Sequence, residues 1–334
     1  MNSLVSILIP AYNSEQWLAE TLSSAINQTW QRKEIIVVDD GSRDRTFEIA
    51  NSFSARGVKV VKQANGGAPA ARNAALALAQ GDYIQWLDAD DLLHPEKIAR
   101  QMERASADHK TLLTSAWGKF FFRTGKARFE PDSLWRDHAP VEWIMTRLKD
   151  NVWMNPAVWL VSRDLTERAG PWDARLSSSG DDDGEYVCRL AAVSDAVAFV
   201  PEARCYYRIG TAGSLNWNME TSSKSLGSLL LSMQLTAGHL LSLEDSPRTR
   251  DAALTYLRTF SSYFYGTDGP YFERLAAFAR RLGGEIPPPR ASWKYLPFEA
   301  VIGRRATSTV IRNWRAVKLR ARRNVDLCLH RLGA

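Results

Sequence analysis

The first hundred residues alternate between short apolar runs and longer segments whose apolar residues recur at helical spacing. The short, β-branched runs that predict strands are residues 5–9, 34–38, 58–61 and 83–87. The segments that predict helices are residues 14–28, 43–55, 69–79 and 95–107. Strands separated by helices of this length indicate βαβ crossovers. The pattern therefore predicts an α/β fold with a mostly parallel sheet that is covered by helices.

The pattern changes along the rest of the chain. Residues 111–122 and 158–161 predict further strands within a mixed central section, and the strand signals stop near residue 216. Beyond that point the apolar spacing predicts helices at residues 226–243, 249–265, 271–282 and 308–332. Three consecutive prolines at residues 287–289 predict a stiff linker among them. We therefore predict an α/β domain over residues 1–215 and a helical C-terminal region over residues 216–334.

Composition excludes several classes of protein. The chain is 45% hydrophobic and 24% charged, which is typical of soluble globular proteins. The longest uncharged run, residues 225–243, is interrupted by polar residues, so we expect a buried amphipathic helix and no membrane span. Residues 1–10 lack the charged leader and cleavage site of a signal peptide and predict a first strand. Three widely spaced cysteines predict no disulfide framework or zinc site and favour a cytoplasmic location.

The positive charge is concentrated at the C-terminus. The net charge is +6, and residues 303–334 contribute +8, which leaves −2 for the rest of the chain. The main body therefore gives no reason to expect a nucleic-acid partner. Within this tail, apolar residues recur at helical spacing between basic ones: Val310, Trp314, Val317, Ala321, Val325, Cys328 and Leu332. Such a helix could lie on an anionic membrane surface, or pack on the domain by its apolar stripe and leave its basic face in solvent.

Two acidic clusters follow predicted strands. Asp88 and Asp90 come after residues 83–87, and Asp40 comes after residues 34–38, so the clusters would meet at one edge of the sheet. Carboxylates spaced by two can face one side and share a Mg²⁺ or Mn²⁺ ion with substrate phosphates. The structural alternatives are that Asp91 caps the next helix and that Asp40 belongs to a turn.

A glycine turn and a third acidic cluster complete the candidate chemistry. Residues 65–73 turn into a helix and could present N–H groups to an anion. Arg72, one turn into that helix, could pair with a phosphate or form a salt bridge with Asp88. Residues 181–185 hold four carboxylates, which repel one another unless a cation, a donor or solvent faces them. This cluster is either part of a site or a solvated loop before a helix at residues 186–193.

Taken together, these segments resemble the inverting family-2 glycosyltransferases with a GT-A fold. The resemblance covers roughly residues 4–215 and is carried, in the same order, by VSILIPAYN (5–13), IVVDDGS (36–42), NGGAPAARN (65–73) and LDADD (87–91). It implies a GT-A type, Rossmann-like sheet and a UDP-, GDP- or dTDP-linked sugar as the donor. It also implies a saccharide or lipid-linked acceptor and a role in bacterial surface polysaccharide or glycoconjugate synthesis.

The resemblance implies a role for each matched position of the donor site. The positions that would contact the donor are Pro10, Ala11, Tyr12, Asp40, Arg72, Asp88 and Ala89. Tyr12 would stack on the base, and Asp40 would accept a hydrogen bond from the base or ribose. Asp90 would be the direct ligand of a Mn²⁺ or Mg²⁺ ion on the donor diphosphate, with Asp88 near the ribose and the metal.

The resemblance also implies a catalytic base and a closing segment. The family's base lies in a Glu-Asp pair before an Arg-Leu helix, which here places Asp183 at the base position. Asp182 stands where Glu is usual, and the extra Asp181 leaves a shift of one residue open. Residues 206–208 followed by 213–215 are similar to a segment that closes over the donor, so Arg208 would reach the diphosphate.

The implied reaction is a single displacement that inverts the anomeric carbon, with Asp183 taking the proton of the acceptor hydroxyl. Two other functions compete with it. One is a nucleotide-sugar-binding protein without activity, which the intact Asp88, Asp90 and Asp183 disfavour. The other is a Mg²⁺-dependent phosphohydrolase, which would place a nucleophilic Asp after the first strand, where this chain has residues 10–12. Some of the twelve tryptophans, such as Trp153, could stack on sugars or belong to the core.

Overall fold

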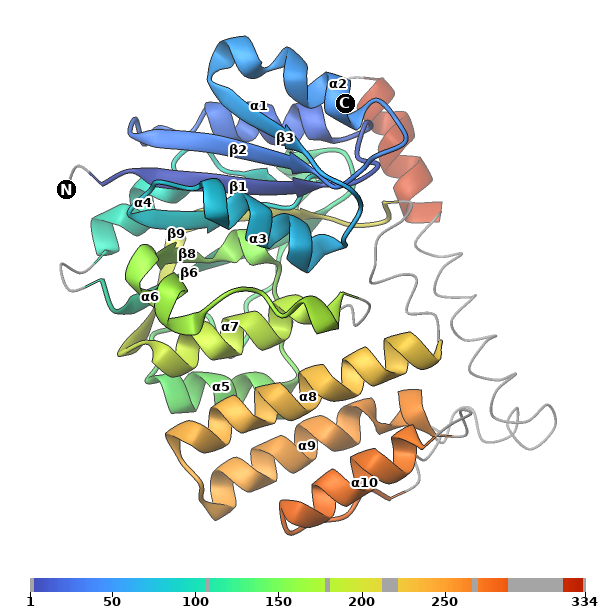
Figure 1. Cartoon of the computed structure of the whole chain (residues 1–334). Helices are drawn as coiled ribbons and strands as arrows, with labels where there is room; N and C mark the ends of the chain where they lie inside the picture. The colour runs from blue at the N-terminus through green and yellow to red at the C-terminus, as the bar shows by residue number, and fades with distance from the viewer. Residues whose placement is uncertain are drawn as a thin grey trace.

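A nine-stranded sheet runs through the α/β part of the chain (Figure 1). The computed structural model describes residues 3–105, 109–177, 181–211, 222–265, 270–287 and 321–332. The strands are β1 (Val5–Ala11), β2 (Lys33–Asp39), β3 (Val58–Lys62), β4 (Tyr83–Trp86), β5 (Leu92–Leu93), β6 (Thr111–Phe120), β7 (Arg128–Phe129), β8 (Leu160–Ser162) and β9 (Ala196–Arg208). Their order is β3-β2-β1-β4-β8-β6-β9-β5, and β7 pairs with β6.

The first four strands of this order form the predicted parallel half. β1 pairs in parallel with both β2 and β4, and β2 with β3. β8 then enters antiparallel between β4 and β6, β9 runs parallel to β6, and the short β5 pairs antiparallel with β9. The predicted mostly parallel, helix-covered sheet is thus confirmed, and the long strand β9 is an addition that the local pattern did not predict.

Seven helices cover this sheet among the described residues. They are α1 (Leu18–Ile26), α2 (Thr46–Ser52), α3 (Ala68–Leu78), α4 (Lys97–Arg104), α5 (Pro140–Asp150), α6 (Arg163–Ala169) and α7 (Asp182–Val193). The central strand β1 is apolar on both faces, and Ile7, Leu8 and Ile9 are completely buried. Such a continuous apolar run is typical of a parallel strand with helices on both sides.

Three further helices stack below α7, away from the sheet (Figure 1). They are α8 (Ser223–Leu243), α9 (Pro247–Phe264) and α10 (Tyr271–Arg281). By length and composition alone α8 could cross a membrane, but half of its most apolar stretch is buried against the rest of the protein. This agrees with the prediction of a buried helix. The predicted domain boundary at residues 215 and 216 and the first part of the predicted helix 308–332 lie outside the described residues.

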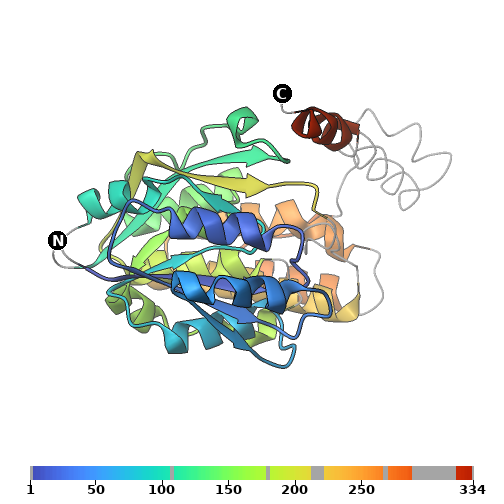
Figure 2. The same ribbon diagram turned by 90° about the horizontal axis from the view of Figure 1, so that it is seen from above.

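A helix over residues 321–331 lies against the segment that follows β6, near the ends of β6 and β9 (Figures 1 and 2). Asp326 pairs with Arg123 at 2.7 Å and accepts a hydrogen bond from the N–H of Phe122 at 3.0 Å. The apolar residues on another side of the helix are open to solvent, with Val325 61% and Leu332 78% exposed. The alternative in which the apolar stripe packs on the domain is therefore wrong for the described part of this helix.

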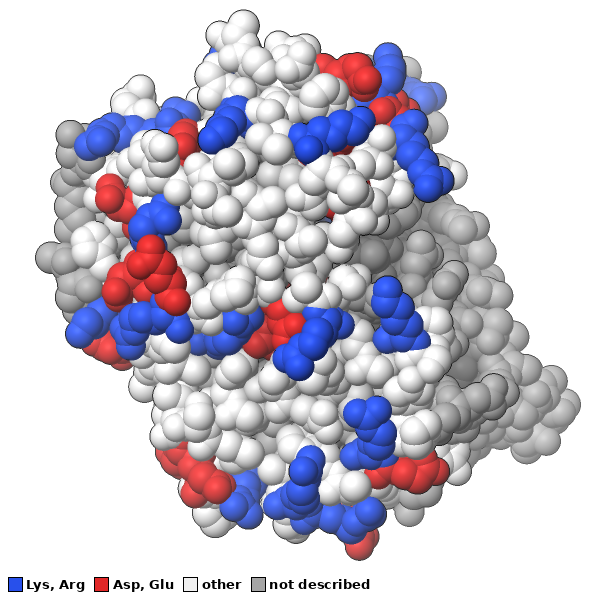
Figure 3. Space-filling model, viewed as in Figure 1, with Lys and Arg blue, Asp and Glu red and all other residues white. Residues whose placement is uncertain are grey.

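Acidic and basic side chains are mixed over the face of the described residues that Figure 3 shows. The three cysteines are free: Cys188 and Cys205 are buried, and Cys328 is exposed on the C-terminal helix.

Candidate active site

The ends of β1 and β2 form one side of the candidate site. The N–H of Asp40 donates to the carbonyl of Ala11 at 2.8 Å, which ties the two strand ends together. Pro10 is partly buried and Ala11 fully buried, whereas Tyr12 at the tip is 46% exposed. An exposed aromatic ring at the carboxyl edge of a parallel sheet is available for stacking on a flat ligand.

Asp40 itself organises the glycine turn before α3. Its carboxylate accepts hydrogen bonds from the N–H groups of Gly66 at 2.9 Å and Gly67 at 2.8 Å, and from the Gln63 amide at 2.7 Å. Gly41 has φ +73°, and a Cβ there would lie 2.9 Å from the N atom of Asn65. Asp40 and Gly41 therefore have a structural role in this turn, and a contact of Asp40 with a nucleotide stays a prediction.

The acidic turn after β4 forms the centre of the site. Asp88 is partly exposed, and burial followed by the charge of Asp88 raises the pKa of Asp90 to about 6. Asp91 is completely buried, and burial followed by the charges of Asp90 and Asp88 raises its pKa well above the usual value. The next helix, α4, begins after Glu96 without a side-chain cap. The alternative in which Asp91 caps this helix is therefore wrong.

Arg208, at the end of β9, holds this acidic turn in place. Its N–H donates to the Asp91 carboxylate at 2.9 Å, and its Nε donates to the carbonyl of Asp90 at 2.8 Å. Its guanidinium also pairs with Glu20 at 2.6 Å and lies between the rings of Trp17 and Phe120. Arg208 is only 2% exposed. The structure thus gives it a positioning role, and its predicted contact with a diphosphate stays a prediction.

Arg72 on α3 joins the second and third acidic clusters. Its guanidinium donates to Asp182 at 2.5 Å and to Asp88 at 3.1 Å, and it lies 4.3 Å from the ring centre of Trp172. Burial opposes its charge, but the carboxylates of Asp182, Asp88 and Asp183 outweigh burial and raise its pKa. The salt bridge with Asp88 that the sequence left as an alternative is therefore present, and it extends to Asp182.

The third cluster forms the start of α7, so its interpretation as a solvated loop is wrong. Asp182 and Asp183 are both buried in the first turn of the helix. Asp181 precedes the helix and accepts hydrogen bonds from Tyr256 at 2.8 Å and Ser232 at 3.1 Å, so it faces the C-terminal helices. The three neighbouring carboxylates thus have different partners, which the sequence spacing alone did not resolve.

Asp183 is the member of this cluster without a side-chain partner among the described residues. Its carboxyl accepts a hydrogen bond from the N–H of Gly184 at 2.8 Å. Burial, followed by the charges of Asp182 and Asp181, raises the pKa of Asp183 well above its usual value, although Arg72 and Arg147 oppose this rise. A buried carboxylate with a raised pKa and no cation pairing directly with it is suited to accept a proton.

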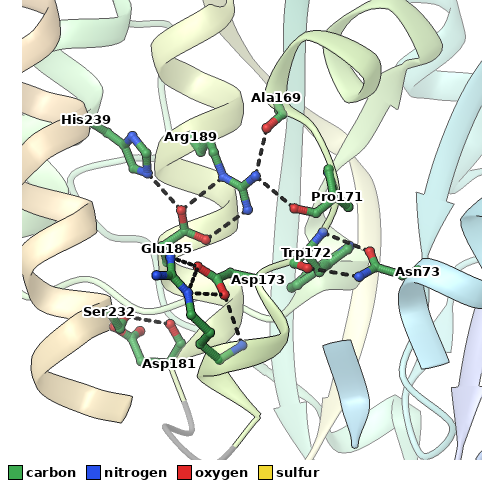
Figure 4. Close-up of polar contacts among 11 residues, drawn as sticks. Asn73, Ala169, Pro171, Trp172, Asp173, Asp181, Glu185, Arg189, Ser232 and His239 are labelled. Atoms are coloured by element: carbon green, nitrogen blue, oxygen red, sulfur yellow. Dashed lines mark hydrogen bonds and ion pairs between the residues drawn. The ribbon is translucent and has the colours of Figure 1, made fainter. Parts of the chain in front are cut away.

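Polar groups of α7 and of the segment before it contact the neighbouring helices (Figure 4). Arg189 forms a two-pronged contact with Glu185, with both distances 3.0 Å, and His239 of α8 contacts the same carboxylate at 2.8 Å. On the other side, the Asn73 amide donates to the carbonyl of Trp172 at 2.9 Å and accepts from its N–H at 2.8 Å. These contacts tie α7 to α8 and the segment before α7 to α3, while the direct contact between α3 and the first turn of α7 is that of Arg72 with Asp182.

Asp88 and Asp90 suit a divalent cation whose remaining ligands come from a bound substrate and from water. No group of three or more His, Cys, Asp or Glu side chains that could hold a metal occurs among the described residues. Mg²⁺ and Mn²⁺ accept a site with few protein carboxylates because phosphates and water complete their shell. Two crowded carboxylates, one with a raised pKa, are an arrangement that a cation between them would stabilise.

The sequence reasoning missed three residues that shape the site. Trp172 lies under Arg72 and stacks on Tyr186 at 4.0 Å, Glu20 pairs with Arg208, and Asp91 anchors the N–H of Arg208. No local pattern marks Trp172 or Glu20, because their partners are distant in the sequence. Asp91 had a signal, since it belongs to the acidic run after β4.

The family match falls on the segments that form the candidate site. The family model "Glycosyl transferase family 2" matches residues 6–155, which include the ends of β1, β2 and β4. An uncharacterized glycosyltransferase of Haemophilus influenzae is 39% identical over 122 residues, which are 36% of this chain and 48% of that protein. The uncharacterized glycosyltransferase EpsJ of Bacillus subtilis is 33% identical over 172 residues, 50% of this chain and 49% of that protein. The chain thus spans about half the length of these relatives.

Solved structures share the fold over more of the chain. The structure of Staphylococcus aureus TarS (residues 1–349) with UDP-GlcNAc matches with a TM-score of 0.66 and 18% identity, over 85% of this chain and 82% of that one. The mannosyltransferase PcManGT of Pyrobaculum calidifontis, in complex with GDP-Man and Mn²⁺, matches with a TM-score of 0.52 and 17% identity, over 94% and 88%. At this identity the likeness shows the fold alone.

Proposed function

We propose that this chain, which belongs to glycosyl transferase family 2 through residues 6–155, transfers a sugar from a nucleotide-diphosphate sugar to an acceptor hydroxyl with inversion. The donor is UDP-, GDP- or dTDP-linked, and the acceptor is a saccharide or a lipid-linked saccharide. The product belongs to bacterial surface polysaccharide or glycoconjugate synthesis. Relatives crystallised with UDP-GlcNAc and with GDP-Man support a nucleotide-sugar donor.

One observation carries this proposal. Arg72 contacts Asp88, in the acidic turn after β4, and Asp182, in the first turn of α7, with the same guanidinium. Asp183 follows Asp182 directly and has no side-chain partner among the described residues. The first turn of α7, which carries the buried Asp183, is thus tied through Arg72 to the acidic turn, where the family resemblance implies that the diphosphate binds. This is the arrangement that a displacement at a sugar carbon bound to that diphosphate requires.

The chemistry of the acceptor side rests on Asp183. Its carboxylate would accept the proton of the acceptor hydroxyl as that oxygen attacks the anomeric carbon from the face opposite the diphosphate. The C–O bond to the diphosphate breaks as the new glycosidic bond forms, so one displacement inverts the configuration. Because the pKa of Asp183 is raised, the carboxylate holds the proton better than an ordinary Asp would. General-base catalysis of this kind contributes on the order of 10²- to 10⁴-fold to the rate.

The chemistry of the donor side rests on the acidic turn and its neighbours. Asp88 and Asp90 would hold a Mn²⁺ or Mg²⁺ ion, which when bound neutralises the negative charge that develops on the leaving diphosphate. Tyr12 would stack on the base at the exposed rim. Arg208 keeps the Asp90–Asp91 turn in place through its backbone contacts. Ala89 is buried inside this turn and sets the spacing of the two carboxylates.

The helix at residues 321–331 is suited to an anionic membrane surface. One side of it is docked on the domain by Asp326, while Val325, Leu329 and Leu332 are exposed at helical spacing. Exposed basic residues, Arg322 and Arg331, flank these apolar residues. An apolar stripe bordered by cations inserts into the headgroup region of anionic lipids. We therefore propose peripheral contact with the inner face of the membrane, which would present a lipid-linked acceptor to the site.

Product analysis tests the proposed reaction. The protein is incubated with UDP-, GDP- and dTDP-linked sugars, Mn²⁺ and a mixture of saccharide and lipid-linked acceptors. Formation of a glycoside of inverted configuration supports the proposal. Release of inorganic phosphate would instead indicate a phosphohydrolase. Binding of a nucleotide sugar without any product would indicate a binding protein, and either result would overturn the proposed function.

A further inference from the structure

A surface pocket of about 420 Å³ lies against the sheet, apart from the candidate donor site at the ends of β1, β2 and β4. It is lined by the second half of β6, the segment after β7, and the end of α5 with the loop that follows. Its lining includes Trp117, Lys119, Glu130, Asp132, Asp150 and Trp153. A volume of this size is in the range of small-molecule binding sites.

The pocket adjoins the candidate site at the end of α5. The ring of Trp153 lies 4.8 Å from that of Tyr207 on β9, on the side of the sheet opposite to the side chain of Arg208, because neighbouring residues of a strand face opposite sides. Asp150 ends α5 less than one helical turn after Arg147, which contacts Asp181 at 3.5 Å. The pocket is therefore connected to the start of α7 through the end of α5.

The chemistry of the lining fits an uncharged sugar. Trp117 and Trp153 form an edge-to-face pair with ring centres 5.6 Å apart, and such aromatic surfaces pack against the C–H face of a sugar ring. Three carboxylates, at Glu130, Asp132 and Asp150, could accept hydrogen bonds from sugar hydroxyls. They exceed the two basic lining residues, Lys119 and Arg128, by one negative charge, and Lys119 already pairs with Glu130 at 3.7 Å, which disfavours a phosphate or another anion.

We infer that this pocket binds a saccharide unit of the acceptor, a role that rests on the proposed glycosyl transfer. The sugar ring lies against Trp117 and Trp153, and its hydroxyls donate to the acidic residues of the lining. The next unit of the acceptor then extends along the end of α5 toward Asp183. The pocket therefore selects oligosaccharide acceptors over single sugars.

Binding is tested by NMR of the full chain with ¹⁵N-labelled indole groups. Cellobiose, chitobiose, lactose and maltose serve as probes, and Trp117→Phe, Trp153→Phe and Trp143→Phe identify three indole resonances by their loss. Trp143 is a matched control because its indole Nε1, like that of Trp117, has no partner among the described residues, but its ring is completely buried and outside the pocket. We expect the Trp117 resonance to move with at least one disaccharide while the Trp143 resonance stays. No movement of the Trp117 and Trp153 resonances with any probe overturns the inference.

Kinetics separate this inference from the proposed function. With the acceptor that product analysis identifies, Trp153→Ala is expected to raise the acceptor KM at least tenfold and leave the donor KM unchanged. Asp150→Asn, an exposed and isosteric change, gives a smaller rise without a risk to folding. Trp30→Ala is the control, since Trp30 is half-buried and its indole donates to the carbonyl of Ser3 in another part of the protein.

An unchanged acceptor KM in Trp153→Ala overturns the proposed role of the pocket but leaves the transfer reaction intact. Sugar binding by NMR without any transfer overturns the reaction and reduces the pocket to a binding site.

Discussion

Arg72 donates to Asp182 at 2.5 Å across 110 positions of the sequence, and this contact joins α3 to the first turn of α7. The same guanidinium reaches Asp88 at 3.1 Å. One buried cation therefore fixes the relative positions of the acidic turn and the proposed base. The predictions below follow from this arrangement and from the groups around it.

Replacement of Arg72 is expected to damage both stability and transfer. Arg72→Met leaves the carboxylates of Asp88 and Asp182 without their buried cation, and breaking such a pair costs about 3–5 kcal/mol. The transfer rate should fall at least a hundredfold because the base and the donor lose their common anchor. Arg45→Met is the control, since its pair with Glu15 is exposed, and it should change the free energy of unfolding by less than about 1 kcal/mol. Chemical denaturation and initial rates measure both effects, and equal effects of the two changes would contradict the account.

Removal of the Asp90 carboxylate is expected to abolish metal-dependent nucleotide binding. In wild type, UDP or GDP with Mn²⁺ should raise the melting temperature, and a ligand at a hundredfold excess over its Kd contributes about 2.7 kcal/mol. Asp90→Asn should lose the part of the shift that depends on Mn²⁺. The Asp90→Asn protein without ligand should be as stable as wild type or more so, because burial disfavours the charge on Asp90.

Asp164→Asn, a change at an exposed residue outside the turn, is the control and should keep the full shift. A retained Mn²⁺-dependent shift in Asp90→Asn would exclude Asp90 as a ligand.

The exposed apolar stripe of the C-terminal helix is expected to govern membrane binding. Val325→Asp with Leu332→Asp should lower binding to phosphatidylglycerol-containing vesicles at least tenfold and leave transfer to a soluble acceptor unchanged. Leu243→Asp, which changes an exposed leucine at the end of α8, is the matched control and should bind as wild type. Vesicle flotation measures the difference. Equal binding by all three proteins, or binding to neutral vesicles alone, would contradict the proposed contact with anionic lipids.

The buried Lys97 is expected to make stability depend on pH. Burial lowers its pKa from 10.5 to about 7, so between these values the unfolded chain binds a proton that the folded protein does not. The contribution of Lys97 to the free energy of unfolding should therefore rise with pH across this window, by about 4–5 kcal/mol in total. The free energy of unfolding of wild type minus that of Lys97→Met, measured below pH 9, isolates this contribution. Above that pH the cysteines of the unfolded chain ionise, and Lys97 itself influences the pKa of buried Cys205. A difference that does not change between pH 7 and 9 would contradict it.

The parallel half of the fold was predictable because its signals are local. Each strand from β1 to β4 is a short apolar run, and each acidic or glycine-containing turn follows one directly in the sequence. The rest depends on distant partners. β9 is recognised by its pairing with β6 and β5, and Asp182 is buried because Arg72 arrives from another helix.

The same limit explains the two wrong structural alternatives at the site. Asp91 precedes a helix at a distance that suggests a cap, but the N–H of Arg208, from the end of β9, takes its carboxylate instead. The acidic cluster before α7 has the composition of a solvated loop, yet Tyr256 and Ser232 of the C-terminal helices and Arg72 of α3 bury it. Composition describes a segment alone, whereas burial depends on what the rest of the chain packs against it.

The most direct test of the central claim compares Asp183→Asn with Asp181→Asn in the transfer reaction across a range of pH. Asp183→Asn should lower kcat by 10²- to 10⁴-fold and leave the donor Kd unchanged, since only the proton acceptor is lost. In wild type the rate should rise with pH through the raised pKa of Asp183, because the base acts only when it is unprotonated. Asp181→Asn should keep most of the rate and lose about 1–3 kcal/mol of stability, because its carboxylate accepts from Tyr256 and Ser232. Full transfer by Asp183→Asn, or loss of transfer in Asp181→Asn alone, would contradict the account.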